Sequence, residues 1–156
     1  TGPEQLSIGK NRMKGYLKAM PMNKLEINTD YIIRCDDFSV KAAKEATQKL
    51  LNLQEIPDAI FGINDDMAIG AIEAIKEKNL KIPEDIAVFG FSNTKRSRYM
   101  NPSVSTVNQF PEKIGEMAAE LLFEQILNNK HAHIREEIVN CELIIRESSD
   151  RSYLND

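Results

Sequence analysis

The chain has 156 residues, of which 42% are hydrophobic and 28% charged, and this is the usage of a globular domain rather than of a disordered segment. A net charge of −4 argues against a broad nucleic-acid-binding surface on this chain, and no apolar run is long enough for a membrane-spanning helix. Cys35 and Cys141 form no Cys-x-x-Cys pair, so we expect two buried, unbonded thiols and a cytoplasmic setting.

The first predicted helix covers residues 7–20, with Ser7 as its cap and Pro21 closing it. Residues 31–35 form a short β-branched run, which predicts a strand, and Ser39 should open the helix that follows. The same unit recurs as a strand at 59–63 with a helix at 65–78, and a third strand is predicted at 86–91. Continuous apolar strands that alternate with helices are typical of a covered parallel sheet, so the predicted fold is a doubly wound α/β fold.

The second half of the chain is less regular. A polar, basic stretch after Phe91 predicts a long loop, followed by a short strand at 104–107. Pro111 lies near the first turn of a strong helix, and the stripe formed by Ile114, Met117 and Leu121 predicts core contacts for that helix. The last segment, 134–146, alternates only loosely.

Ligands of an open parallel sheet bind beyond the carboxyl ends of the strands. The residues at those positions are all hydrogen-bonding groups, and none of them is an activated nucleophile or a metal-binding cluster: Asp36, Asp37, Asn64, Asp65, Asp66, Ser92, Asn93, Asn108 and Gln109. Together with an arginine they suit a neutral, hydroxyl-rich ligand such as a sugar, and they predict neither an enzyme nor a cofactor.

Each of these positions also has a simpler interpretation. Residues 64–66 open a helix, where Asn64, Asp65 and Asp66 would serve as caps or dipole partners, and Asp36 and Asp37 are open to the same interpretation. Arg12 would be a solvated helix residue on periodicity alone. His131 and His133 form a His-x-His pair without a third ligand nearby, so no metal site is expected.

Five blocks, in order along nearly the whole chain, resemble the effector-binding region of the lactose/galactose repressor (LacI/GalR) family. They are Thr1-Gly-Pro3 with Arg12-Met-Lys-Gly-Tyr16, Ile56-Pro-Asp-Ala-Ile-Phe61 with Asn64-Asp-Asp-Met-Ala-Ile-Gly70, Ile82-Pro-Glu-Asp-Ile86 with Gly90-Phe91, Asn101-Pro-Ser-Val-Ser-Thr-Val-Asn-Gln109, and Leu143-Ile-Ile-Arg-Glu-Ser-Ser149.

The resemblance implies a periplasmic-binding-protein-like fold of two lobes with a small effector between them. Residues 1–108 would form the C-terminal lobe, 109–140 a small piece of the N-terminal lobe and 141–149 a return to the first lobe, with a tail at 150–156. The helix-turn-helix headpiece and most of the N-terminal lobe, together with a strand before Thr1, would lie outside this sequence.

The resemblance also assigns roles to residues. Arg12, Asn64 and Gln109 match effector-binding positions, and Ser92 stands where many members have an aspartate, whose bidentate contact a hydroxyl cannot make. Asp36, which directly follows the strand predicted at 31–35, is a further predicted effector-binding residue. The family dimer surface is matched by Met67, Ile69, Ala71, Arg98 and Met100.

Dimerisation has a second line of support. The helix at 65–78 has apolar residues around more of its circumference than one sheet contact requires, so we expect a second copy to cover the excess. The alternative is that a neighbouring helix of the same lobe covers it.

Two function classes remain open. The first is the sugar-sensing, homodimeric region of a transcriptional regulator that reaches operator DNA only through the headpiece. The second is a solute-binding protein of a sugar transporter, which shares the fold and the Asn-Asp block. The blocks that begin at Ile82, Asn101 and Leu143 favour the regulator. An α/β enzyme ranks third because no catalytic group is evident.

Overall fold

The structure is a computed structural model that describes residues 1–3, 6–127 and 135–152. Along the chain it contains the elements α1 (Ser7–Met22), a short 3-10 helix η1 (Thr29–Tyr31), α2 (Val40–Leu50), β1 (Ala59–Phe61), α3 (Asp65–Glu77), β2 (Ala87–Phe89), α4 (Lys95–Tyr99), β3 (Thr106–Asn108), α5 (Pro111–Leu127) and β4 (Glu142–Ile144).

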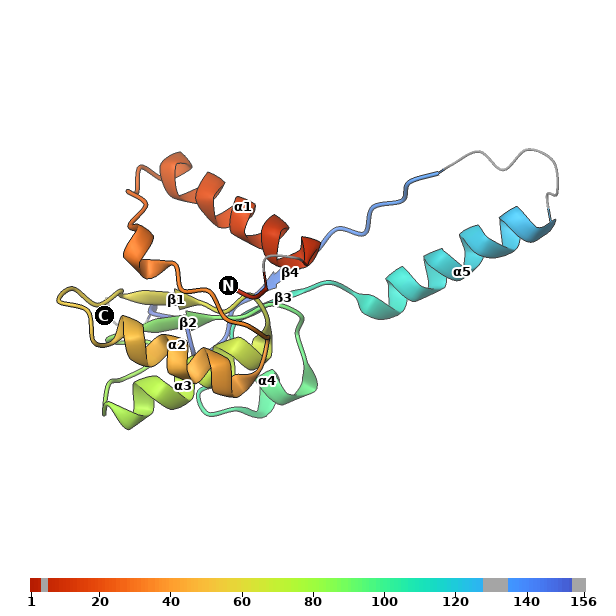
Figure 1. The fold of residues 1–156 in the computed structure, drawn as a ribbon. Helices are drawn as coiled ribbons and strands as arrows, with labels where there is room; N and C mark the ends of the chain where they lie inside the picture. Colours follow the sequence, from red (N-terminus) through yellow and green to blue (C-terminus); the bar gives the residue numbers. More distant parts are fainter. Residues whose placement is uncertain (4–5, 128–134, 153–156) are drawn as a thin grey trace.

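The sheet is mixed rather than wholly parallel. β1 pairs with β2 in parallel, with Ile60 opposite Val88, and α3 connects the two strands. β3 pairs antiparallel with β4, and a single parallel bridge from Phe89 to Ser105 joins the two pairs. Helix α1 lies on one side of the β1–β2 pair and helices α2 and α3 on the other (Figure 1). The fold is therefore α/β with helices on both faces, as predicted, but β4 breaks the parallel pattern.

The prediction of a strand at residues 31–35 is wrong, because these residues are described and form no strand. Tyr31 ends η1, and Ile32 to Cys35 follow an irregular path. Ile33 and Cys35 form backbone hydrogen bonds with Thr1, whose ammonium donates to the Ile33 carbonyl and whose carbonyl accepts from the Cys35 N–H at 2.8 Å. A β-branched run becomes a strand only where a neighbouring strand supplies a ladder of partners, and Thr1 supplies one rung.

The predicted helix starts are partly right. The side chain of Ser39 caps α2 by accepting from the Ala42 N–H at 3.1 Å, as expected. Ser7 does not cap α1, because it is already the first helical residue and Leu6 occupies the cap position without a side-chain bond. Pro21 lies inside the last turn of α1. The basic stretch after Phe91 contains α4, which Thr94 caps through Ser97 at 3.3 Å.

The core of this part of the chain surrounds α3. Ile69 and Ile75 are 0% exposed and Ile72 is 1% exposed. Helix α2 packs along α3, while β2 and α4 contact its other sides. The expectation that α3 keeps an apolar face for a second copy is therefore wrong, because neighbouring elements of the same chain cover Met67, Ile69 and Ala71.

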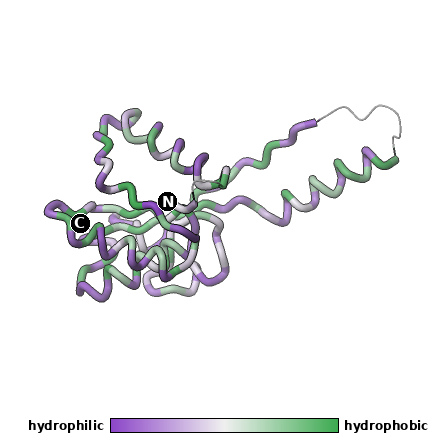
Figure 2. Tube along the Cα trace, viewed as in Figure 1, coloured by the Kyte–Doolittle hydropathy of each residue, from purple (hydrophilic) through white to green (hydrophobic). Residues whose placement is uncertain are grey.

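Helix α5 has no buried residue, so its stripe of Ile114, Met117 and Leu121 does not form core inside the described chain. Figure 1 shows α5 projecting away from the sheet together with the segment that returns to β4. Apolar residues lie along its length (Figure 2), and Phe123 is 62% exposed. The periodicity predicted the amphipathic helix correctly, but burial needs a second layer, and the described residues do not provide one.

Beyond β4 the returning chain docks onto β2 and onto the residues that precede β3. Val88 N–H donates to the Ser148 carbonyl at 2.7 Å, and the Ser148 hydroxyl donates to the Val88 carbonyl at 2.6 Å. The Ser148 N–H donates to Ser103 at 3.0 Å. The Ser105 N–H donates to the Ser148 hydroxyl at 2.9 Å, and the Ser105 hydroxyl donates to the Arg146 carbonyl at 2.9 Å. These buried hydroxyls replace a regular strand ladder here and hold this segment against the sheet.

Candidate functional site

Arg12 extends from α1 over the carboxyl ends of the strands. Its guanidinium donates to the Ile63 carbonyl just past β1 and to Oε1 of Gln109 at 3.4 Å. The same guanidinium lies 3.8 Å from the centre of the Phe91 ring, a cation–π distance. Arg12 is therefore not simply a solvated helix residue, because its guanidinium contacts three other segments of the chain.

Ser92 and Gln109 complete this polar cluster. Gln109 donates from Nε2 to the Ser92 hydroxyl at 3.2 Å, so the side chain is held at both ends. Ser92 has φ of 119° and Asn93 has φ of 52°, which are uncommon values for residues with a Cβ. Backbone bonds from Ser92 N–H to Val107 at 2.9 Å and from Asn93 N–H to the Thr106 hydroxyl at 3.2 Å hold this corner.

Asp65 lies behind the corner and is 0% exposed. Its carboxylate accepts from the Thr94 N–H and from the Thr106 hydroxyl, both at 2.6 Å. The carboxylate therefore joins α3, the start of α4 and β3 at one point. The cap or dipole interpretation holds for its place in the first turn of α3, but sequence reasoning missed these tertiary contacts. Asp66 is different, since it is exposed and faces Arg96 at 3.8 Å.

An open hollow of about 470 Å³ lies over the cluster between α1 and the strand ends. Its polar groups include Arg12 and Gln109, and its walls carry the aromatic rings of Tyr16, Phe61 and Phe91. The rings were not predicted as site residues. Tyr16 lies one helical turn after Arg12 and Phe91 directly precedes Ser92, so the spacing already contained a signal for both.

The electrostatics of the hollow are those of a partly shielded cation. Burial lowers the pKa of the Arg12 guanidinium, while the negative charge of Asp65 acts in the opposite direction. Arginine remains protonated at neutral pH even so. Its described hydrogen bonds use only part of the guanidinium's donor capacity, so further N–H groups can serve a ligand's hydroxyl or carbonyl oxygens.

The remaining predicted residues do not join this cluster in the same way. The Asn64 side chain caps α3 by accepting from the Met67 N–H at 2.8 Å, which leaves its amide N–H groups for other partners. Asp36 is exposed and lines a separate hollow of about 250 Å³ with Arg34 and Lys41. The structure thus brings together Arg12, Ser92 and Gln109, and it leaves Asp36 apart.

The cysteines are unbonded, as predicted, but only Cys35 is buried and Cys141 is exposed. Within the described ranges there is no group of three or more potential metal ligands, and His131 and His133 lie outside them. The helices described are not long and apolar enough to cross a membrane.

The family model for the periplasmic binding protein-like domain matches residues 1–149. The chain therefore belongs to that domain family, in the form carried by LacI-type transcriptional regulators. It is 35% identical over 148 residues to the HTH-type transcriptional repressor CytR of Escherichia coli (strain K12), a match that covers 95% of this chain and 43% of the repressor. The HTH-type transcriptional repressor PurR of Pasteurella multocida (strain Pm70) is 39% identical and covers 91% of this chain, which spans 42% of that protein.

Solved structures give the same assignment. A regulatory protein of the LacI family from Chloroflexus aggregans superposes with a TM-score of 0.86 at 35% identity, covering 95% of this chain and 53% of its own. The complex of the transcriptional regulator CelR with cellobiose superposes with a TM-score of 0.86 at 27% identity, covering 96% of this chain and 45% of its own. The chain thus spans about half of these structures or less.

Proposed function

We propose that this chain is the effector-sensing region of a LacI-type transcriptional regulator and that its effector is a sugar. The observation that carries the proposal is the pair of Arg12 and Gln109 in a hollow with aromatic walls, where the Ser92 hydroxyl holds the Gln109 side chain from behind. A planar fork of N–H donors suits ring hydroxyls, and aromatic faces suit the C–H face of a pyranose. The cellobiose complex of the structural relative supports the same class of ligand.

The effector would lie between two lobes. We assign residues 1–108 and 141–149 to the C-terminal lobe and 109–140 to the N-terminal lobe. The paired strands β3 and β4 support this division, because they carry the chain outward to α5 and back again (Figure 1). The exposed apolar side of α5 fits a helix that packs against the remainder of an N-terminal lobe.

Operator binding would be the task of a helix-turn-helix headpiece, and this acidic chain would act on it from the cytoplasm. A dimer would use the region of α4, where Arg98 and Tyr99 are exposed and Met100 packs against the α3 core.

The alternative, a solute-binding protein of a sugar transporter, has less support because the relatives reported above are transcriptional regulators. An upstream helix-turn-helix or an export signal in the full gene separates the two.

Calorimetric titration of the full-length protein with a panel of mono- and disaccharides, cellobiose included, tests the proposal. We expect one sugar of the panel to bind with about one molecule per chain. Arg12→Ala should weaken its binding at least about tenfold, because one charge-assisted hydrogen bond is lost. Lys14→Ala, on the exposed side of α1, is the matched control and should leave affinity unchanged. Equal affinity of both variants, or no binding across the panel, overturns the sugar-site proposal.

A further inference from the structure

The side chain of Arg146 joins the segment after β4 to the corner formed by Ser92 and Asn93. Its Nη2 donates to Oδ1 of Asn93 at 2.7 Å, and its Nη1 donates to the Val104 carbonyl at 2.7 Å. Val104 is a core residue with 0% exposure, so one of the two bonds is anchored in the core. Because the guanidinium holds its donors in a rigid planar fork, the two bonds fix the place of the Asn93 side chain relative to that core.

The corner is a part of the backbone that needs such support. Ser92 and Asn93 are consecutive residues with a Cβ, and their φ angles of 119° and 52° lie in the region that favours glycine. Residues in sparsely populated backbone regions keep their conformation only where the surrounding contacts over-determine it. The backbone N–H groups of both residues are bonded to β3, and Arg146 adds a bond to the Asn93 side chain.

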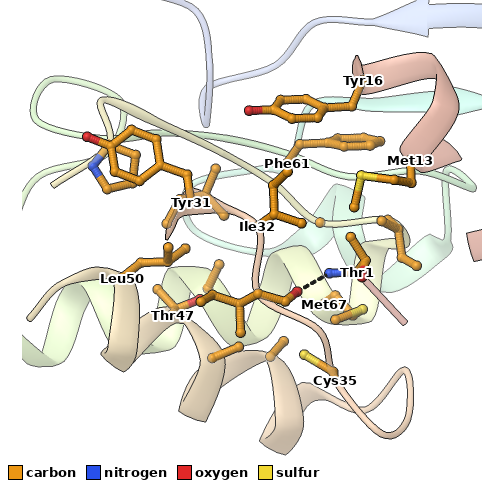
Figure 3. Close-up of a pocket in the computed structure, with 18 of the residues that line it drawn as sticks. Thr1, Met13, Tyr16, Tyr31, Ile32, Cys35, Thr47, Leu50, Phe61 and Met67 are labelled. Atoms are coloured by element: carbon orange, nitrogen blue, oxygen red, sulfur yellow. Dashed lines mark hydrogen bonds between the residues drawn. The ribbon is translucent and has the colours of Figure 1, made fainter. Parts of the chain in front are cut away.

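The corner in turn holds the polar side of the hollow. The Ser92 hydroxyl accepts from Nε2 of Gln109 at 3.2 Å, while Oε1 of Gln109 accepts from Arg12 at 3.4 Å. A glutamine side chain has several rotatable bonds, so these two hydrogen bonds decide its orientation. The aromatic wall is held differently, since Figure 3 shows the rings of Tyr16 and Phe61 next to each other, from α1 and β1.

A simpler interpretation is that Arg146 only fastens the segment after β4 to the sheet. The backbone of Arg146 already does this, because its N–H donates to the Ser105 hydroxyl at 2.7 Å and its carbonyl accepts from the same hydroxyl at 2.9 Å. Burial and the positive charge of Arg98 lower the pKa of the Arg146 guanidinium, while Asp65 acts in the opposite direction. The cation therefore stands at the corner at a cost that the backbone attachment does not require.

We propose that Arg146 is a positioning residue of the effector hollow, and that it acts through Asn93 and Ser92 to orient the amide of Gln109. Arg146 is not one of the residues that line the hollow, so it acts on a bound sugar only through the corner. The inference deepens the proposed function and rests on it for the ligand alone, because the orientation of Gln109 can be measured without one.

The first measurement needs no ligand. In full-length protein labelled with nitrogen-15 glutamine, the side-chain amide signal of Gln109 is identified by its loss in Gln109→Glu. We expect Arg146→Ala to shift this signal toward that of a solvent-exposed glutamine. Arg151→Ala is the matched control, because Arg151 also lies after β4 and also binds backbone carbonyls, those of Pro83 at 2.7 Å and Asp58 at 2.9 Å. It should leave the signal in place.

The second measurement is calorimetric titration of the same variants with each sugar of the panel, cellobiose included. Arg146→Ala should weaken sugar binding about fivefold, a typical effect of a residue that does not touch the ligand, and Arg151→Ala should not weaken it. Asn93→Ala removes the same hydrogen bond from its other end and should have a similar effect, so it also serves if Arg146→Ala does not fold. The double variant should bind no more weakly than either single variant, because both changes break one connection.

The two measurements separate this inference from the sugar proposal. An unmoved Gln109 signal in Arg146→Ala overturns the inference, whether or not a sugar binds. A shifted signal with parental sugar affinity also overturns it, as do losses that add up fully in the double variant. If the parent protein binds no sugar and the Gln109 signal still shifts as expected, the sugar proposal fails and the positioning by Arg146 stands.

Discussion

Replacing Asp65 by alanine removes the carboxylate that joins α3, the start of α4 and β3. The side chain is 0% exposed and accepts two hydrogen bonds, from the Thr94 N–H and the Thr106 hydroxyl. Alanine leaves both donors buried without this acceptor. A buried donor that loses its partner costs more than the net strength of an ordinary hydrogen bond, because water cannot replace the partner.

The expected magnitude follows from the two bonds. A hydrogen bond to a carboxylate contributes about 1.5–3 kcal/mol, so the loss of two such bonds in Asp65→Ala should lower the free energy of unfolding by about 3–6 kcal/mol. Asp66→Ala is the matched control, since Asp66 is in the same helical turn but exposed, with only a long ion pair to Arg96. Its cost should stay below about 1 kcal/mol.

Urea unfolding followed by circular dichroism measures the difference. With a denaturant slope of about 2 kcal/mol per molar, the urea midpoint of Asp65→Ala should lie about 1.5–3 M below that of the parent chain. Asp65→Asn keeps one acceptor oxygen, so its urea midpoint should lie between those of Asp65→Ala and the parent chain. This variant preserves the comparison if Asp65→Ala does not fold. Equal midpoints for the Asp65 and Asp66 variants would refute the reasoning.

Three further outcomes are expected. Ellman's reagent should modify Cys141 quickly and Cys35 slowly without denaturant, because burial both covers the Cys35 thiol and raises its pKa; two equally fast thiols would contradict this. Ile69→Asp should unfold the chain rather than dissociate a dimer, because Ile69 lies in the core. Tyr99→Asp should shift sedimentation toward the monomer and leave the helical content unchanged, because Tyr99 is exposed. A folded, monomeric Ile69→Asp variant would contradict both expectations. A gel-shift assay with operator DNA should show no salt-dependent complex for this acidic chain alone.

Local features were readable from the sequence because their causes lie within a few residues. Asn64 and Ser39 cap their helices through N–H groups three residues further on, and Pro111 begins α5 because its fixed φ suits a first turn. The strand-end rule placed Ser92 and Gln109 at the same crevice for a similar reason, since the carboxyl ends of parallel strands meet at one edge. Arg12, which lies inside a helix, was assigned to this crevice by the resemblance alone. The cap interpretation of Asn64 was equally local, and the sequence pattern alone did not separate it from a ligand role.

Only the tertiary structure decided which apolar and acidic residues are covered. The apolar residues of α3 exceeded one sheet contact, yet α2 and α4 cover them, so the excess was no sign of a partner. The equally apolar α5 stays exposed, because burial depends on a second layer and not on periodicity. Asp65 and Asp66 are adjacent and chemically identical, but one is locked between three elements and the other faces solvent. Residues 31–35 have the composition of a strand, but a strand exists only where a neighbour accepts its hydrogen bonds, and that neighbour is set by contacts far along the chain.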